Sequence, residues 1–327
     1  ASGWRGYRLE GDVIHMGARL YHYSTACFLA ADPLGHASDM SLYRYANNDP
    51  VNGVDPSGRA GYFIDGTWYN AAGGKDGAPP SLLPEMARDY VGNGYYFAGP
   101  GGDNKDRISG ATGYGVSDIS ANVYNKIVEN YNAGDTIINM AAWSRGNVAM
   151  MQVADRIYNE GIPDLSSARR MTTTTHSYTP TGMMVSNTTT TTVYDKYLVA
   201  PRSNEKIITQ MHMIDPVYAM GWPFNDIDVA YPKTIPSNVE SSYAYLAGDS
   251  NVTKSWWNPF NWLENAINSA IDNRTIPSNV GSTQYFSGNH VDVAGAGQAY
   301  TRFDVYNSIN VNSGNLFNNN SNMGLGK

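Results

Sequence analysis

The chain contains little cysteine and little charge. Cys27 is the only cysteine among 327 residues, so no disulfide can form within the chain and folding requires no oxidising compartment. Charged residues make up 16% of the sequence and the formal net charge is -7. Because binding to a phosphate backbone needs a basic surface, we exclude nucleic acid as a partner.

Long apolar runs are also missing. No segment approaches the roughly 18 consecutive apolar residues of a membrane span, and the first residues lack a basic segment followed by an apolar one. We therefore expect neither a transmembrane helix nor a signal peptide, and we interpret the chain as the C-terminal part of a longer protein. Its length is ample for one large core with a small appendage.

The composition changes near residue 58. Between Tyr21 and Gly58 the sequence is rich in turn dipeptides, which are Asp32-Pro33, Asn48-Asp49-Pro50, Asn52-Gly53 and Asp55-Pro56. Such dipeptides are typical of short strands joined by tight turns. We predict two parts: residues 1–60, rich in strands and turns, and residues 61–327, a larger domain.

The first part contains a family motif. Its segments are Phe28-Leu29-Ala30-Ala31-Asp32-Pro33-Leu34-Gly35, Leu42 to Asn52, and Asp55-Pro56-Ser57-Gly58. Residues 18 to 58 resemble the Rhs repeat-associated core, which closes the shell of polymorphic toxins. The resemblance implies that a toxin follows, that the remaining Rhs shell and a secretion spike are partners, and that self-cleavage occurs near Gly58 to Ala60. Asp32 and Asp55 would share a proton and activate water; alternatively, both simply begin Asp-Pro turns.

The second part alternates strand and helix patterns. Gly61–Ile64 and Thr136–Ala142 read as buried strands, whereas Ser117–Tyr131 and Asn147–Asn159 have helical spacing. Ser117 can cap its helix and Gly134 can end it. The glycine-rich stretch from Gly92 to Gly115 lacks the ending of a phosphate-binding loop and is predicted to be plain loop. The pattern predicts an α/β fold, a sheet with helices on both faces.

Ser144 lies in a turn between a predicted strand and a predicted helix. The turn reads Ala142-Trp143-Ser144-Arg145-Gly146, a G-x-S-x-G elbow with alanine for the first glycine. The N-terminus of the following helix would stabilise an oxyanion, with the Arg145 N–H as one donor and Gly66 or Thr67 as the second. The alternative is a serine with no role beyond the turn.

A nucleophilic serine needs a base and an orienting acid, which in this fold follow it in the order acid, then histidine. Asp215 directly follows the apolar strand Ile207–Ile214, and His290 lies in a glycine-bounded loop. His176 falls in a threonine-rich segment and His212 within a strand. A single histidine is more often structural, but the three residues in this order favour a catalytic triad.

These segments resemble the type VI lipase effectors of the first class. The matching blocks are Phe63 to Trp68, Trp143 to Gly146, Ile214 to Val217, and Gly288 to Gly295; Ala142, Pro216 and Ala294 depart from the family pattern. The resemblance implies an α/β-hydrolase-like phospholipase without cofactor or metal, with Ser144 as nucleophile, Asp215 as acid and His290 as base. Asp65 and Asp292 would hold loops. It further implies delivery into the periplasm of a target bacterial cell, phospholipid membrane as partner, and a cognate immunity protein.

Two further segments allow alternatives. Threonine runs around Thr179-Pro180-Thr181-Gly182 predict an inserted hairpin over residues 171–198. Trp256, Trp257 and Trp262 lie beside an apolar helical pattern and form either a lid at the membrane surface or part of the core. Two other functions also stay open: a soluble esterase or amidase of the same fold, and an inactive shell or interaction module.

Overall fold

The computed structural model describes residues 8–16, 19–30, 43, 59–74, 77–103, 115–181, 183–217, 232–248, 276–287, 290–295 and 299–317. Asp32, Asp55 and the three tryptophans Trp256, Trp257 and Trp262 lie outside the described residues. The expectations about self-cleavage and about a tryptophan lid therefore stay predictions.

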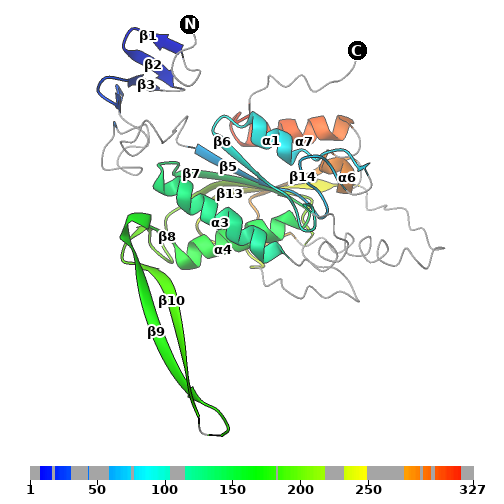
Figure 1. Cartoon of the computed structure of the whole chain (residues 1–327). Helices are drawn as coiled ribbons and strands as arrows, with labels where there is room; N and C mark the ends of the chain where they lie inside the picture. Colours follow the sequence, from blue (N-terminus) through cyan, green and yellow to red (C-terminus); the bar gives the residue numbers. More distant parts are fainter. Residues whose placement is uncertain are drawn as a thin grey trace, which may run out of the picture.

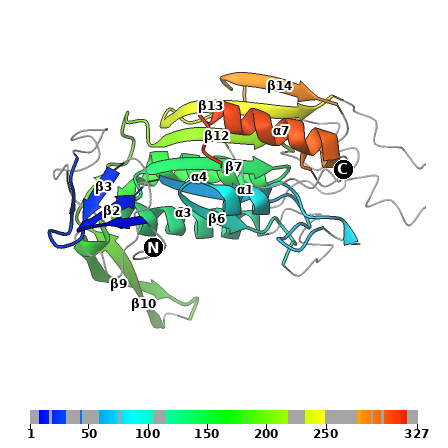
Figure 2. The ribbon, with the colours of Figure 1, turned by 90° about the horizontal axis from the view of Figure 1, so that it is seen from above.

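A six-stranded sheet forms the centre of the molecule. Its order is β14 (Ser282–Phe286), β13 (Val239–Ala247), β12 (Ile208–Ile214), β7 (Ile137–Trp143), β5 (Arg59–Ile64) and β6 (Asn93–Phe97) (Figure 2). Each neighbouring pair is parallel. The carboxyl ends of the strands consequently share one edge of the sheet, where ligands bind in open α/β sheets.

Helices cover both faces of this sheet, as predicted (Figure 1). On one face lie α3 (Val116–Asn132) and α4 (Gly146–Glu160), and on the other lie α1 (Leu83–Asp89), α6 (His290–Val293) and α7 (Ala299–Asn312). Alternate residues of β5 point to opposite faces: Tyr62 and Ile64 join the core under α3 and α4, and Phe63 joins the core under α1 and α7. Burial on both faces explains the continuous apolar runs in the sequence.

The predicted helices are confirmed, with one correction at a cap. Helix α3 begins at Val116, one residue earlier than predicted, and its N-cap is Gly115, whose φ is 93°. Ser117 therefore lies inside the first turn and does not cap the helix. Gly134 follows the C-terminal end with a φ of 107°, as its predicted role requires.

The prediction that residues 92 to 115 are plain loop is wrong for Asn93–Phe97, which form the edge strand β6. Three consecutive aromatic residues supply the strand preference that the glycines obscured. Tyr95 stacks on Tyr62 of β5 with ring centroids 5.6 Å apart. Gly94 lies so close to the Ala87 backbone of α1 that a side chain would overlap with it, which explains the glycine within a strand.

Other strands lie outside the central sheet. A small antiparallel sheet contains β1 (Arg8–Glu10), β2 (Val13–Met16), β3 (Arg19–His22) and β4 (Cys27–Phe28). Two short strands, β8 (Ile162–Pro163) and β11 (Tyr197–Val199), pair at the base of a hairpin made by β9 (Ala168–Tyr178) and β10 (Met184–Tyr194). The predicted hairpin is thus confirmed, and it projects from the α3 and α4 side of the molecule (Figure 1).

Candidate active site

Ser144 lies in a strained turn at the carboxyl edge of the sheet. The turn connects β7 to α4, and the serine has a φ of 52°, which is rare for a residue with a side chain. The Ser144 N–H donates to the Ile214 carbonyl at 3.0 Å. The Ser144 carbonyl accepts from the Asn147 N–H at 3.2 Å and from the Asn147 Nδ2 at 2.9 Å. These bonds hold the backbone in a conformation that it would otherwise avoid.

The residues that flank the turn explain why small side chains occur there. A Cβ on Gly146 would lie 2.5 Å from the Asp65 carbonyl oxygen and 2.7 Å from that of Ile64, so only glycine lets α4 approach β5 this closely. Ala142 replaces the first glycine of the motif, and its methyl group is buried in the core under α4. The alanine is therefore compatible with the turn.

Asp215 and His290 form a buried pair beside this turn. Asp215 directly follows β12 with a φ of 36°, and its Oδ2 lies 2.6 Å from the His290 Nδ1. The other oxygen, Oδ1, accepts from the Ala247 N–H at 3.1 Å. An ionised carboxylate only accepts hydrogen bonds, so Nδ1 donates and the neutral ring presents Nε2 as an acceptor. In this tautomer Nε2 carries a lone pair that can accept a proton.

The segment that carries His290 is anchored to the α1 region. The Leu82 N–H donates to the Ala294 carbonyl at 2.8 Å. Arg302 of α7 donates to the Gly295 carbonyl at 2.7 Å and forms an ion pair with Glu85 of α1. The imidazole also lies against the indole of Trp143, with ring centroids 5.2 Å apart. Because Trp143 precedes Ser144, this contact places His290 next to the serine turn.

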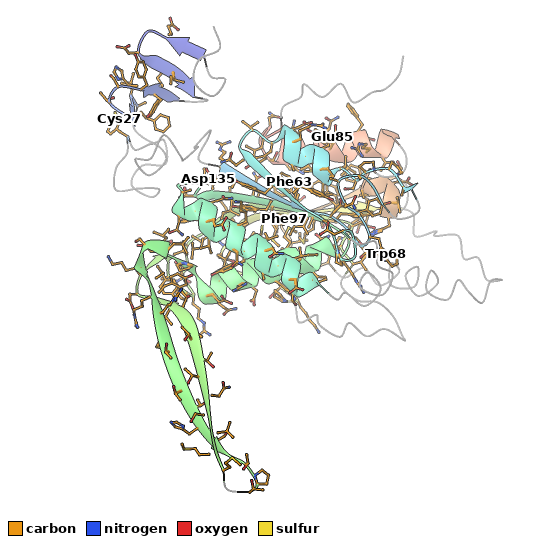
Figure 3. The ribbon with its side chains drawn as sticks, viewed as in Figure 1. Cys27, Phe63, Trp68, Glu85, Phe97 and Asp135 are labelled. Carbon is orange, nitrogen blue, oxygen red and sulfur yellow. The ribbon has the colours of Figure 1, made fainter. Side chains whose placement is uncertain are left out.

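The loop after β5 contains the predicted second oxyanion donors. The Gly66 N–H donates to the Asp65 Oδ1 at 2.8 Å, so it is directed at that carboxylate. The backbone N–H groups of Trp68 and Tyr69 donate to the carbonyls of Pro100 and Gly66. Within Asp65–Tyr69, Thr67 is the residue whose N–H makes no hydrogen bond to the described residues. Figure 3 shows the neighbouring Trp68 at the opposite end of the sheet from Asp135.

Asp65 is fully buried and accepts three hydrogen bonds. Besides the Gly66 N–H, the Ser81 hydroxyl and the Tyr96 hydroxyl donate to its Oδ2 at 3.0 and 2.7 Å. Burial raises the pKa of Asp65 to about 6, and the three donors counteract that rise. The predicted loop-holding role of Asp65 agrees with these contacts. Asp292 is also buried, and its backbone carbonyl accepts from the Gly295 N–H at 2.8 Å.

The other two histidines that follow Ser144 in the sequence lie elsewhere. His212 is buried within β12, as predicted, and its Nδ1 lies 2.9 Å from the Tyr245 hydroxyl. His176 is exposed on the β9–β10 hairpin, 2.8 Å from the Ser186 hydroxyl. Of the three histidines that follow Ser144 in the sequence, the structure places His290 with Asp215 at the serine turn.

Sequence reasoning missed the residues that support this site. Asn147, in the first turn of α4, hydrogen-bonds to the Ser144 carbonyl. Tyr96 and Ser81 donate to Asp65 from other parts of the chain. The Ala247 N–H at the end of β13 donates to Asp215. Asn147 is adjacent to the motif and so carried a usable signal. The others are brought in by strand order, which the local sequence does not contain.

Within the residues that the structure describes, no cluster of three or more histidine, cysteine or acidic side chains is arranged to hold a metal ion. The described helices also include none that is both long and apolar enough to cross a membrane.

The strand order and the serine turn after the central strand are those of an α/β hydrolase. A scan against family models matches residues 62–311 to the family described as T6SS, phospholipase effector Tle1-like, catalytic domain. The match covers most of the sequence, and the chain belongs to this family. It is therefore a hydrolase domain of the phospholipase type, and membership in an effector family indicates secretion into a target cell and a membrane lipid substrate.

A search of curated proteins gave no match. Among solved structures, the chain is similar to a thermophilic esterase, Est2, from the Planctomycetes species Thermogutta terrifontis, solved with butyrate bound. The identity is 13% and the TM-score 0.33, over 79% of this chain and 84% of that chain. The family match begins at residue 62, so the Rhs resemblance of residues 18 to 58 stays a prediction.

Proposed function

We propose that the chain hydrolyses acyl ester bonds of membrane phospholipids, with Ser144, His290 and Asp215 as a catalytic triad. The Ser144 Oγ attacks the ester carbonyl carbon while the His290 Nε2 takes the hydroxyl proton. The tetrahedral intermediate collapses, and His290 returns the proton to the leaving lysophospholipid oxygen. Water then attacks the acyl-enzyme with His290 as base, which releases the fatty acid and restores the serine.

The observation that carries this proposal is the buried 2.6 Å bond between Asp215 and His290 beside a serine with a φ of 52°. Asp215 has one oxygen bonded to the Ala247 N–H, which leaves the other directed at the imidazole. The carboxylate can stabilise the imidazolium that forms when the serine loses its proton. A buried histidine that is bonded to a carboxylate and lies beside a strained serine turn is the arrangement that a catalytic triad requires.

The oxyanion would be held by two backbone donors, Arg145 and Thr67. The Arg145 N–H belongs to the N-terminal end of α4, where the helix dipole favours negative charge. The Thr67 N–H suits this role better than the Gly66 N–H, because the Gly66 N–H already donates to Asp65. No side chain is needed for either contact.

Labelling with a fluorophosphonate probe tests the proposal most directly. We expect the wild-type chain to be modified at Ser144, and Ser144→Ala to lose both labelling and phospholipid hydrolysis while its melting temperature stays within a few degrees. An unlabelled wild-type chain would favour the inactive interaction module. Hydrolysis retained within a few-fold by Ser144→Ala would falsify the triad.

Substrate class needs a second measurement. Family membership supports phospholipid, so turnover of phospholipid vesicles should exceed that of a short monomeric ester. The opposite preference would favour a soluble esterase or amidase. Within this proposal, the cognate immunity protein protects the producing cell and the periplasm of the target cell is the site of action.

We also propose that residues 1–60 are the end of an Rhs shell that releases the hydrolase by self-cleavage. Strand β5 begins at Arg59, so a cut between residues 58 and 59 leaves the central sheet whole. Asp32→Asn or Asp55→Asn should block the cut in the full-length parent protein and leave the activity of the released domain unchanged. Mass spectrometry that finds the same cut in both variants would refute the aspartate pair.

A further inference from the structure

Asp65 is a buried carboxylate that the ester chemistry does not use. It follows β5 at the edge of the sheet that carries Ser144, and its side chain is inaccessible to solvent. Burying a carboxylate is costly unless its oxygens are hydrogen-bonded. The three donors to Asp65 come from the adjoining loop, from the residues before α1 and from β6. Such a position and such partners suggest a role in the geometry of the loop.

The two peptide groups that follow Asp65 are held by hydrogen bonds and by close packing. Asp65 binds the Gly66 N–H and so orients the peptide between residues 65 and 66. The Gly66 carbonyl accepts from the Tyr69 N–H at 3.1 Å and lies against Gly99, where a side chain would overlap with it. Since the C=O and N–H of a trans peptide point in opposite directions, fixing the Gly66 carbonyl also fixes the direction of the Thr67 N–H.

The same loop contacts the serine turn directly. The Gly66 Cα lies against the indole of Trp143, where a Cβ would come within 2.6 Å of the ring. The Asp65 carbonyl also packs against Gly146, the first residue of α4. The loop that Asp65 holds is therefore in contact with the residues on both sides of Ser144 and Arg145.

We propose that Asp65 is a positioning residue of the oxyanion hole: its carboxylate holds the Gly66 N–H and thereby the start of the loop, so that the following peptide presents the Thr67 N–H to the reacting carbonyl. This inference rests on the proposed ester hydrolysis at Ser144. The role requires an acceptor for the Gly66 N–H. Alanine removes this acceptor, whereas asparagine could keep its amide oxygen on Gly66 and direct its N–H₂ group at the Ser81 and Tyr96 hydroxyls, which can also accept hydrogen bonds.

The test compares ligands that do and do not develop an oxyanion. A trifluoromethyl ketone analogue of the lipid adds to the Ser144 hydroxyl and forms a tetrahedral oxyanion, whereas an ether analogue binds without reaction. For Asp65→Ala we expect kcat/KM and affinity for the ketone to fall by the same factor, about 10- to 100-fold, because a displaced donor loses transition-state stabilisation. Affinity for the ether analogue should stay within two-fold.

Two further variants keep the test decisive. Tyr96→Phe removes one donor to the Asp65 Oδ2 and leaves the bond from Gly66 to Oδ1, so it should retain kcat/KM within about five-fold. If Asp65→Ala does not fold, an amide-to-ester replacement of the Thr67 backbone N–H removes the donor itself and should give the same selective loss of ketone affinity.

The outcomes separate this inference from the proposed function. Equal weakening of ketone and ether binding by Asp65→Ala would show a general structural role and overturn the inference. Unchanged kinetics in Asp65→Ala, or in the Thr67 ester variant, would also overturn it. Activity retained by Ser144→Ala would instead overturn the proposed function.

Discussion

Two buried histidines, His212 in β12 and His290 in α6, have very different surroundings. His212 is 3% exposed and His290 is 6% exposed, so burial hardly distinguishes them. His212 stacks on Tyr243, with ring centroids 5.1 Å apart, and its ring nitrogens meet the Tyr245 hydroxyl and the Gln210 amide oxygen. His290 instead faces the Asp215 carboxylate.

The partners decide what each ring can do. Burial lowers the pKa of His212 to about 3, which keeps its ring neutral at physiological pH. No carboxylate contacts it among the described residues, so a proton gained there would remain uncompensated. At His290 the carboxylate offers compensation for the positive charge that general-base catalysis creates. Burial without an acid therefore gives a structural histidine, and burial with one gives a candidate base.

Replacing each histidine gives the largest expected contrast. His290→Ala should reduce kcat/KM for phospholipid vesicles by at least about 10³-fold, because the serine loses its base. His212→Phe, which keeps a ring of similar shape, should retain activity within a few-fold. The measurement is initial-rate kinetics on both variants. Loss of activity in His212→Phe with retention in His290→Ala would reverse the assignment.

Asp215→Asn sharpens the comparison by removing the charge and keeping the shape. An amide can donate to the His290 Nδ1, which favours the tautomer whose Nε2 carries the proton and cannot act as a base. We expect kcat to fall by about 10²- to 10⁴-fold with little change in KM. The Ala247 N–H can still donate to the amide oxygen, so the melting temperature should change little. A variant with kcat close to wild type would place the orienting acid elsewhere.

The serine turn was predictable because its signals are local. Ser144, Arg145 and Gly146 occur together in a short motif between a strand pattern and a helix pattern, and Asp215 directly follows an apolar strand. His290 needed both its order in the chain and a family resemblance. The bond between Asp215 and His290 joins residues 75 positions apart, and the sequence contains no measure of that distance.

The supporting contacts around Asp65 were not predictable in the same way. Tyr96 reaches Asp65 because β6 pairs with β5 in register. The glycine-rich stretch around β6 hid this strand in the sequence. Ser81 reaches the same carboxylate from the residues before α1. Strand order is a property of the whole chain, since it depends on how all segments bury their apolar faces together. The family resemblance included Asp65 but gave no information about its hydrogen-bond partners.

A smaller effect is expected in the pH dependence of stability. The unfolded chain protonates His212 near pH 6.5 and the folded chain only near pH 3, so this residue makes stability fall as the pH drops through that window, by up to about 1.4 kcal/mol per pH unit. Asp65 acts in the opposite sense: its folded pKa of about 6 lies above the unfolded value, so the folded chain gains stability as the pH falls from about 6 to 4.

Variants can separate these two contributions. From pH 6.5 to 4, the free energy of unfolding of His212→Phe should fall less steeply than that of the wild type, and that of Asp65→Asn should fall more steeply. Urea denaturation at several pH values measures both slopes. Parallel curves for wild type and His212→Phe would mean that His212 titrates normally in the folded chain.

The smallest effect is expected far from both histidines, in the β9–β10 hairpin. Helix α4 starts at the edge of the sheet that carries Ser144 and runs back along the sheet, so the hairpin that follows it begins near the opposite edge. Its strands carry mostly exposed side chains, and threonine pairs such as Thr172 with Thr190 hydrogen-bond only across the hairpin.

Replacing residues 171–191 with an Asn-Gly turn removes no contact to the central core. It should therefore leave the melting temperature within about 2 °C of wild type and vesicle hydrolysis within two-fold. The Arg169–Asp195 ion pair at the base stays in place in this variant and keeps the ends of the deletion together. Vesicle hydrolysis that fell ten-fold, with a short soluble ester hydrolysed at the normal rate, would contradict this prediction. The hairpin would then contribute to lipid binding and would not be independent of the site at Ser144.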